Sequence, residues 1–431
     1  MKKYNLFLFF TALLLASCQT PQKENYEWLK KSLDTASAQL KITGEKLKGT
    51  GKFPRSIHQV CDTMFISRQL ERDPSVFKDS IESESTPELA GQILLCPVSD
   101  WTSGFFPGSL WYAYELTRKD SLKNFAIYYT NQLNPVRYIK DTHDVGFMVN
   151  CSYGNALRLS PNDTIKEVIK ETADNLCGRF NDTIGCIRSW DFGEWNYPVI
   201  IDNIMNLDLL FNAYNLTSNY RYNEVAIKHA KTTMRNHFRP DYTCYHVVSY
   251  NNDGTVERKQ THQGKNDDSS WSRGQAWAVY GYTSCYRETN DTTFLNFAVN
   301  IADMIMERVK TDDAIPYWDY DAPVTEETPR DASAAAVTAA GFIELSTMVP
   351  NGKKYLDYAE KILKSLSSDA YLAKVGENQG FILMHSVGSL PNGSEIDTPL
   401  NYADYYYLEA LKRFMDLKKL RLENGEVKVI E

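Results

Sequence analysis

The sequence predicts an all-α protein, an (α/α)6 barrel made of six helical hairpins. Apolar residues recur at helical spacing in twelve segments of the 431-residue chain, whereas runs of period-two alternation are few. The connections between these segments alternate between a few residues and much longer loops. Short connections join antiparallel neighbours, so all the long loops meet at one end of the barrel, where we expect the active site. A solenoid of the tetratricopeptide kind is the competing architecture, but no fixed repeat period is present.

The helices follow one another as pairs along the chain. The twelve expected helices cover residues 24–48, 104–117, 121–133, 145–159, 164–178, 200–215, 221–238, 271–288, 292–309, 332–348, 354–367 and 402–415. Every second helix of this series follows a long loop, and a short link such as residues 118–120 leads from it to the next helix. We therefore expect the second, fourth, sixth, eighth, tenth and twelfth helices to form the inner ring.

The first residues indicate export. Two lysines precede an apolar run from Leu6 to Leu15, which is too short to span a bilayer and is typical of a signal peptide. The run ends in Leu-Ala-Ser-Cys, which resembles a bacterial lipobox that is cleaved before a lipidated Cys18. An ordinary signal peptidase site beside a cysteine is the alternative. We expect a signal peptide at 1–17, a polar tether at 18–25 and a single catalytic domain at 26–431.

We expect the mature protein to be an exported bacterial lipoprotein that contacts the membrane through its lipid anchor only. Gln19 and the lack of an early acidic cluster favour the periplasmic side over the cell surface. The net charge of −8 and the absence of a long basic run argue against a nucleic-acid partner. The sequence does not predict an oligomeric state.

Cysteine spacing and aromatic content bear on the kind of site. Cys18 is one of eight cysteines, and the other seven form no CxxC or Cys/His pattern at zinc spacing. We therefore expect no metal or other cofactor, and at most one disulfide. Aromatic residues make up 13% of the chain, with 27 Tyr and 8 Trp, and aromatic faces are what sugar rings stack on, although core packing is the commoner role of any one of them.

Three motifs in the long loops and the helix starts that follow them concentrate the polar and aromatic residues. They are His-Asp-Val-Gly-Phe at 143–147, Asp-Asn-Ile-Met-Asn at 202–206 and Ser-Trp-Ser-Arg-Gly-Gln-Ala-Trp at 270–277. Helix amino termini point free N–H groups into such a region and favour anions there. Asp202 and Asn206 lie beside a four-residue apolar stripe made of Ile201, Met205, Leu209 and Ala213.

The combination of these motifs resembles glycoside hydrolase family 88, the unsaturated glucuronyl hydrolases. The resemblance covers nearly all of the mature chain, from Trp101 to the Asn-Tyr-Ala-Asp-Tyr-Tyr segment at 401–406. It implies an (α/α)6 barrel, an unsaturated uronate as the substrate, and two catalytic acids, here Asp144 and Asp202. The candidate substrate-binding residues are Trp101, His246, Thr261, Gln263, Trp271, Arg273, Trp277 and Ser386.

Each of these assignments has a structural alternative. Both aspartates directly precede a helix, so each could merely cap that helix or complement its dipole. Arg273 and Trp277 are four residues apart on one helical face, so guanidinium and indole could meet one ligand or form a structural pair. Lone histidines are often structural, so we select His246 on the resemblance and leave His262 unassigned.

The implied reaction is the hydration of a vinyl ether. The unsaturated uronate left by a polysaccharide lyase has a C4–C5 double bond, and a proton on C4 makes C5 electrophilic toward water. We expect Asp202 to deliver the proton and activate the water, and Asp144 to position the ring hydroxyls and perturb its partner. A helix amino terminus lowers a carboxyl pKa, so burial and the charge of Asp144 must outweigh the dipole to keep the acid protonated.

Two alternatives and the identity of the polymer stay open at this point. An unsaturated rhamnogalacturonyl hydrolase would use the same chemistry on pectin fragments, and a non-catalytic glycan-binding lipoprotein would need the aromatics but no paired acids. Family members that accept sulfated sugars carry Ser-x-x-Ser-x-Lys, whereas this chain has both serines, at 386 and 389, and Pro391 in place of the lysine. The missing lysine puts tolerance of sulfate in question.

Overall fold

The computed structural model describes residues 26–59 and 88–430. The expected signal peptide, Cys18, the tether and Cys61 lie outside the described residues. Each of the twelve predicted helices is present, and their ends fall close to the predicted ones. The outer helices are α1 (Glu27–Leu47), α4 (Asp120–Gln132), α7 (Asp163–Gly178), α9 (Tyr220–Asn236), α11 (Thr292–Arg308) and α13 (Lys353–Leu366).

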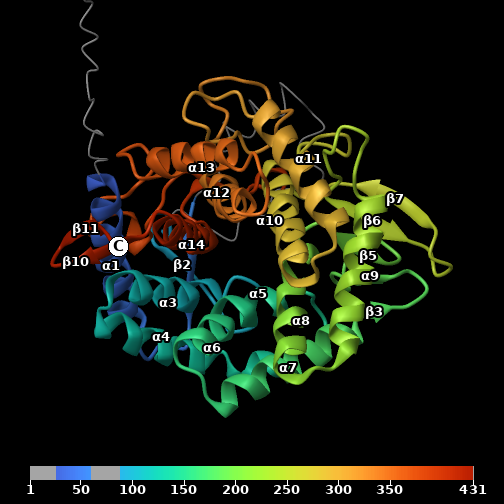
Figure 1. Ribbon diagram of the computed structural model, residues 1–431, viewed down its shortest axis with the longest axis horizontal. Helices are drawn as coiled ribbons and strands as arrows, with labels where there is room; N and C mark the ends of the chain where they lie inside the picture. Colours follow the sequence, from blue (N-terminus) through green and yellow to red (C-terminus); the bar gives the residue numbers. More distant parts are fainter. Residues whose placement is uncertain (1–25, 60–87, 431) are drawn as a thin grey trace, which may run out of the picture.

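The inner helices form a closed ring. They are α3 (Phe105–Thr117), α5 (Val145–Val149) with α6 (Asn155–Leu159), α8 (Asn203–Thr217), α10 (Ser272–Thr289), α12 (Ala332–Ser346) and α14 (Asn401–Leu417). One turn of π-helix, Asn150–Gly154, joins α5 to α6, so the predicted helix 145–159 is continuous but not regular. Each inner helix packs against the next, and α14 packs against α3, which closes the ring (Figure 1). The (α/α)6 barrel is therefore confirmed, and a solenoid is excluded.

The burial of the helices explains why six lie inside and six outside. Thirteen of the fifteen residues of α12 are buried, because other helices surround it on all sides. Small residues let these inner helices approach closely, and a Cβ on Gly341 would lie only 3.1 Å from the Cα of Tyr280 on α10. The outer helix α13 buries a single stripe of residues, namely Tyr355, Ala359, Ile362, Leu363 and Leu366.

The short turns of the barrel share one construction. The residues that follow α3, α8 and α10 adopt the left-handed conformation, with φ near 56° at Arg118, Ser218 and Asn290. After two of these turns a side chain then caps the next outer helix, as Asn219 does for α9 and Asp291 for α11. These tight links fix the end of the barrel opposite the long loops.

The long loops contain short antiparallel strands that the sequence did not locate. An antiparallel pair, a hairpin and a three-stranded sheet lie near the middle of the chain or before it: β1 (Phe53–Ile57) with β2 (Ile93–Cys96), β3 (Phe180–Asn181) with β4 (Cys186–Ile187), and β5 (Pro198–Ile200) with β6 (Val247–Tyr250) and β7 (Val256–Gln260). Two more hairpins are β8 (Ser386–Ser389) with β9 (Ser394–Thr398), and β10 (Leu420–Glu423) with β11 (Glu426–Val429). Except for the last hairpin, these strands hold the long loops at the open end of the barrel.

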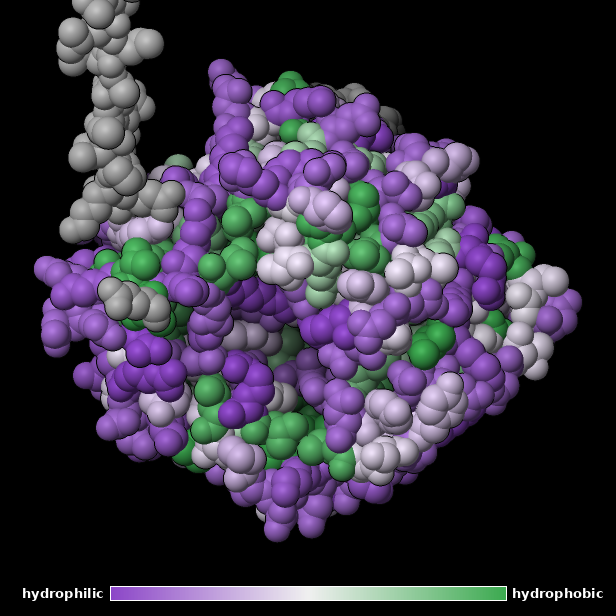
Figure 2. Space-filling view, viewed as in Figure 1, coloured by the Kyte–Doolittle hydropathy of each residue, from purple (hydrophilic) through white to green (hydrophobic). Residues whose placement is uncertain are grey.

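The cysteines, the apolarity of the helices and the molecular surface bear on the predictions about disulfides and the membrane. The six cysteines of the described residues are all free. Within residues 26–59 and 88–430, no helix combines the length and apolarity needed to span a bilayer. Figure 2 shows one face of the molecule as mainly hydrophilic around a central hollow, with hydrophobic residues in separate small groups.

Candidate active site

A cleft of about 1030 Å³ opens among the long loops. Of the ten predicted site residues, Asp144, Asp202, Trp101 and Gln263 line it. They come from the four long loops that precede α3, α5, α8 and α10, which converge because the inner helices begin at the same end of the ring. Both acids line one cleft at the end of the barrel that carries the long loops, as predicted, and their catalytic role stays a prediction.

Asp144 directly precedes α5 but does not cap it. Its carboxylate makes no hydrogen bond to the helix amino terminus. One oxygen instead accepts a 2.8 Å hydrogen bond from the Thr142 hydroxyl, and the other lies 3.3 Å from Nε2 of His143. About a fifth of the side chain, 21%, stays exposed to the cleft. The capping interpretation of Asp144 is therefore wrong.

Asp202 precedes α8 in the same way and is more deeply buried. Its side chain is 9% exposed and makes no capping hydrogen bond, in contrast to Asp331, which accepts hydrogen bonds from two backbone N–H groups at the start of α12. The Asp202 Oδ2 atom lies 3.5 Å from Nε2 of His246. The helix start therefore holds Asp202 in place without occupying its carboxylate.

His246 is held in one tautomer. Its Nδ1 accepts hydrogen bonds of 3.1 Å from the backbone N–H groups of both His262 and Gln263. An Nδ1 that accepts leaves the proton of the neutral ring on Nε2, which is the atom that faces Asp202. The loop that carries Gln263 into the cleft thus also aims a donor of His246 at the Asp202 carboxylate.

The two carboxyl groups are shifted in opposite directions. Burial raises the pKa of Asp144, with a further contribution from the Asp202 charge, and His143 and Thr142 oppose this only in part. Burial also acts to raise the pKa of Asp202, but the hydrogen bond and charge of His246, together with Arg273, outweigh it, so the pKa is lowered. The expectation that burial and Asp144 keep Asp202 protonated is therefore wrong for the protein alone. Acid–base pairs commonly have such separated pKa values.

Five predicted binding residues lie in the layer behind the cleft. Thr261, Trp271, Arg273, Trp277 and Ser386 are all nearly or fully buried and do not line it. His246 is equally buried and reaches the site through Asp202. Direct contact of these six residues with a substrate stays a prediction.

Arg273 pairs with a different tryptophan from the one expected. Its guanidinium lies over the ring of Trp271 at 4.4 Å and donates to the carbonyl oxygens of Val387 and Gly388 and to Asp331. Trp277 packs instead against Phe147 and Tyr406 in the core. The two side chains have different neighbours, so the alternative of a structural Arg273–Trp277 pair is not what the structure shows, and a shared ligand stays a prediction.

Several residues that line the cleft were missed. An aromatic group beside Asp202 comprises Trp190, stacked on Phe192 at 4.8 Å with an interplanar angle of 15°, and His262, 5.6 Å from Trp190. Three aromatic residues between 190 and 195 in a polar loop were the available signal. Arg55, Asp100 and Glu395 also line the cleft. Asp100 directly precedes the predicted Trp101, which was the available signal, whereas Arg55 and Glu395 are far apart in sequence and gave none.

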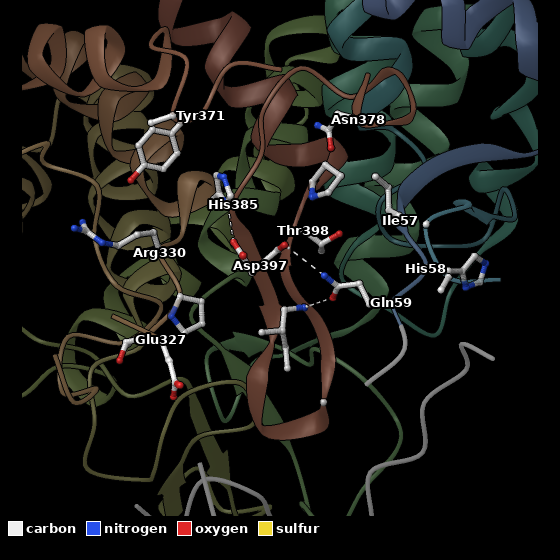
Figure 3. A pocket seen from close by; sticks show the side chains of 18 of the residues that line it. Ile57, His58, Gln59, Glu327, Arg330, Tyr371, Asn378, His385, Asp397 and Thr398 are labelled. Carbon is white, nitrogen blue, oxygen red and sulfur yellow. Dashed lines mark hydrogen bonds and ion pairs between the residues drawn. The ribbon is translucent and has the colours of Figure 1, made fainter. Parts of the chain in front are cut away.

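The β8–β9 hairpin separates this cleft from a second cavity of about 990 Å³, whose lining residues are shown in Figure 3. On the side of the second cavity, His385 Nδ1 lies 2.7 Å from Asp397 Oδ1, and Gln59 bonds the hairpin backbone at Ile396. On the side of the cleft, Gly388, Ser389 and Ser394 line the wall. The hairpin therefore forms one wall of the cleft.

The open end of this double ring of helices holds an aromatic group and two carboxylates that cap no helix. This combination is typical of a carbohydrate-processing enzyme. Residues 77–416 match the model of Glycosyl Hydrolase Family 88, and residues 1–72 match a model described as a domain of unknown function. The chain belongs to glycosyl hydrolase family 88. The resemblance inferred from the motifs is confirmed, and the chain is an enzyme of this family.

Named relatives agree with this assignment. The chain is 46% identical to the unsaturated glucuronyl hydrolase of Formosa agariphila, over 77% of this chain and 83% of the relative. It is 30% identical to the unsaturated chondroitin disaccharide hydrolase of Streptococcus pneumoniae, over 87% and 97% of the two chains.

Solved structures share the fold. An unsaturated glucuronyl hydrolase specific for heparin is 47% identical, with a TM-score of 0.84 over 93% of this chain and all of the other. The unsaturated glucuronyl hydrolase of Bacillus sp. GL1 is 27% identical, with a TM-score of 0.77 over 90% and 97% of the chains. These relatives are hydrolases, which disfavours the non-catalytic glycan-binding alternative.

Proposed function

We propose that the protein removes the terminal 4,5-unsaturated uronic acid from oligosaccharides that a polysaccharide lyase has produced. The observation that carries this proposal is the pair of cleft-facing carboxylates, Asp144 and Asp202, which cap no helix and differ in pKa direction. The names of the relatives, which include unsaturated glucuronyl and unsaturated chondroitin disaccharide hydrolases, support the substrate class.

The reaction is a hydration followed by ring opening. A proton adds to C4 of the vinyl ether, the resulting cation at C5 is stabilised by the ring oxygen, and water adds at C5 with loss of its proton. The hemiketal then opens to a ketone at C5 and a hemiacetal at C1, and the hemiacetal collapses to an aldehyde with release of the remaining sugar chain as an alcohol. Because the anomeric carbon is not attacked, the usual relation between carboxylate separation and stereochemical outcome does not apply.

Asp202 is the proposed acid and base of this reaction. In the protein alone its pKa is lowered, by His246 above all among its charged neighbours. The bound uronate brings a like charge next to Asp202 and displaces water, and both effects raise a carboxyl pKa. Substrate binding therefore supplies the shift that the free protein lacks, and the Nε2–H of His246 keeps the carboxylate oriented while its proton is transferred.

The surrounding residues have proposed roles that follow from their positions. Asp144, on the exposed side of the cleft, positions the ring hydroxyls, and Trp101 and Gln263 bind the sugar from the walls. Trp271, Arg273 and Ser386 support these walls from behind. Tyr402 lines the cleft, and its Oη is buried without a hydrogen-bond partner among the described residues, which favours a polar ligand beside it.

A panel of unsaturated disaccharides tests the proposal. Lyase products of hyaluronan, chondroitin, heparin and gellan are incubated with the protein, and loss of the absorbance of the conjugated double bond is followed. Unsaturated rhamnogalacturonan fragments test the second candidate, which uses the same chemistry on pectin. We expect consumption of at least one uronate of the first group; no loss of absorbance from any of them contradicts the proposal.

We also propose that the chain reaches the periplasm as a lipoprotein and forms one catalytic domain from residue 26 onward. The lipobox-like sequence before Cys18 supports the anchor. The single domain is supported by α1, which belongs to the segment matched by the domain of unknown function and packs against α3 and α4 as the sixth outer helix of the ring.

A further inference from the structure

Arg55 reaches the cleft from outside the segment that matches the hydrolase family. It lies on β1, within residues 1–72, whereas the family match begins at residue 77. The pairing of β1 with β2 shifts register between Pro54 and Ser56, so Arg55 is the extra residue of a β-bulge. Bulges beside active sites commonly redirect a side chain, and this one turns Arg55 into the cleft.

Two carboxylates hold the Arg55 guanidinium. Its Nε and Nη2 donate to the two oxygens of Glu395 at 2.8 and 3.1 Å, and its Nη1 donates to Asp100 at 2.8 Å. The side chains of Arg55, Asp100 and Glu395 are 27%, 14% and 7% exposed. The three residues, called here the Arg55 triad, form a rigid group with a net charge of −1 that keeps part of its surface in the cleft.

The triad fixes the hairpin that forms the cleft wall. Glu395 adopts φ of 54°, a left-handed conformation that is unfavourable for a residue with a side chain and persists only where its surroundings hold it. Its side chain packs onto Gly388, where a Cβ would lie 2.7 Å from the Cβ of Glu395. Gly388 in turn receives hydrogen bonds from Arg273 and Gln263. Arg55 thus connects the N-terminal segment to the same hairpin wall to which Arg273 and Gln263 are hydrogen-bonded.

Gln59 secures the hairpin from the opposite side. Its amide oxygen accepts a 2.9 Å hydrogen bond from the N–H of Ile396, and its amide nitrogen faces the carbonyl of Asp397 at 3.4 Å (Figure 3). Arg55 on β1 and Gln59 just after it therefore bind the two sides of one hairpin. The geometry of the wall depends on the N-terminal segment.

The position and charge of the triad indicate which part of the substrate it meets. Asp202 and His246 are 9% and 1% exposed and lie at the buried end of the cleft, where the terminal uronate must bind. Arg55 and Asp100 of the triad are more exposed, at 27% and 14%, whereas Glu395, at 7%, is as buried as Asp202. The rest of the oligosaccharide leads outward, so the triad faces the next sugar. Of the described lining residues, five are acidic and only Arg55 and Lys140 are basic, apart from His262. An anionic substituent on that sugar meets net negative charge.

We propose that the Arg55 triad is the subsite for the sugar that follows the uronate, and that it selects a sugar with hydroxyl or amino groups over an O-sulfated one. This inference rests on the proposed hydrolase function. Arg55 acts as a positioning residue: it holds Glu395 and Asp100 so that their free lone pairs accept hydrogen bonds from the sugar, and it leaves one uncompensated negative charge.

The test compares two unsaturated disaccharides that differ only in a 6-O-sulfate on the second sugar. kcat and KM are measured between about 20 and 500 mM salt for the wild type, Arg55→Gln and Glu395→Gln. The matched control is Arg158→Gln, because Arg158 lines a different cavity and makes a similar two-point contact with Glu115. Circular dichroism confirms that each variant is folded.

The wild type is expected to have a higher kcat/KM for the unsulfated disaccharide than for the sulfated one. This difference in kcat/KM should become smaller at higher salt, because salt screens the repulsion. Glu395→Gln removes a negative charge and should raise the ratio of sulfated to unsulfated kcat/KM about tenfold, whereas Arg55→Gln exposes two carboxylates and should lower it. The control variant Arg158→Gln should change kcat/KM for both disaccharides by the same factor.

Two results would overturn the inference. A wild type that prefers the sulfated disaccharide, with kcat/KM falling as salt rises, makes Arg55 an anion receptor. Equal effects of Arg55→Gln on both substrates, as in the Arg158 control, make its role structural only. If the wild type consumes neither disaccharide nor any other member of the panel, the proposed function itself fails, which is a separate outcome.

Discussion

Gly146 sets the distance between the two helices that carry the catalytic candidates. A Cβ at this position would lie 2.5 Å from the Cβ of Asn206 and 2.7 Å from its Cα, where apolar contacts need about 3.5–4.0 Å. Asn206 also accepts the 2.7 Å hydrogen bond of the Phe147 N–H, which ties α5 to α8. Because the obstructing atoms include backbone, Gly146→Ala can be accommodated only if the two helix starts separate by about 1 Å.

That separation has two measurable consequences. Overpacking of this kind costs about 1–3 kcal/mol in the free energy of unfolding, measured by urea denaturation. Asp144 and Asp202 are two and four residues from the clash, and a displacement of about 1 Å between groups that act on one substrate can lower kcat by about 100-fold. We expect both losses in Gly146→Ala, and kcat should fall more than KM rises.

Gly178→Ala is the matched control, because a Cβ there meets nothing within 4 Å. It lies at the end of α7, and the exchange should leave kcat unchanged and the stability equal or slightly higher. A folded Gly146→Ala variant with wild-type kcat would refute the reasoning that the α5–α8 contact sets the geometry of the two acids.

Three further predictions concern the acids, the core and the anchor. Asp202→Asn should lower kcat by about 100-fold to 10,000-fold with little change in KM, whereas Asp144→Asn should also raise KM; near wild-type kinetics of Asp202→Asn would remove it as the acid. Burial raises the pKa of Asp404 to about 7, although it accepts hydrogen bonds from two backbone N–H groups. The folded state then holds this proton more tightly than the unfolded state, so stability should decrease as pH rises from about 4 to 7, by up to about 4 kcal/mol; parallel pH profiles of unfolding for the wild type and Asp404→Asn would contradict this. Cys18→Ala should leave activity intact and abolish membrane fractionation, and a wild-type protein found only in the soluble fraction would refute the lipobox interpretation.

The barrel was predictable because its helices are long and each has one dominant environment. The outer helix α13 has a single apolar stripe, and the alternation of short and long connections places the inner helices without knowledge of any contact. The strands were not located, because segments such as Phe180–Asn181 and Cys186–Ile187 are only two residues long. Their pairing depends on how the loops meet in space and not on a local pattern.

The site was predictable where residues stand together in motifs. Asp144, Asp202, Trp101 and Gln263 reach the cleft as expected, but the sequence could not decide whether the aspartates cap their helices, because that depends on the direction of each side chain. The lowered pKa of Asp202 could not be predicted either, since it depends on His246, which directly precedes strand β6 and lies 44 residues further along the chain.

The contact between Arg55 and Glu395 shows the same limit more strongly. The two residues are 340 positions apart and belong to short strands that no periodicity indicates. Neither side chain has a neighbour in sequence that suggests a role in the cleft. Only the folded chain brings the bulge of β1 against the β8–β9 hairpin.

The position of the new hydrogen in the product tests the central claim most directly. Turnover of an unsaturated disaccharide is carried out in heavy water, and the released uronate product is examined by mass spectrometry and NMR. If a proton is delivered to C4 and water adds at C5, deuterium must appear at C4 of the product. Loss of the double bond without deuterium at C4 would contradict the hydration mechanism and with it the role of Asp202.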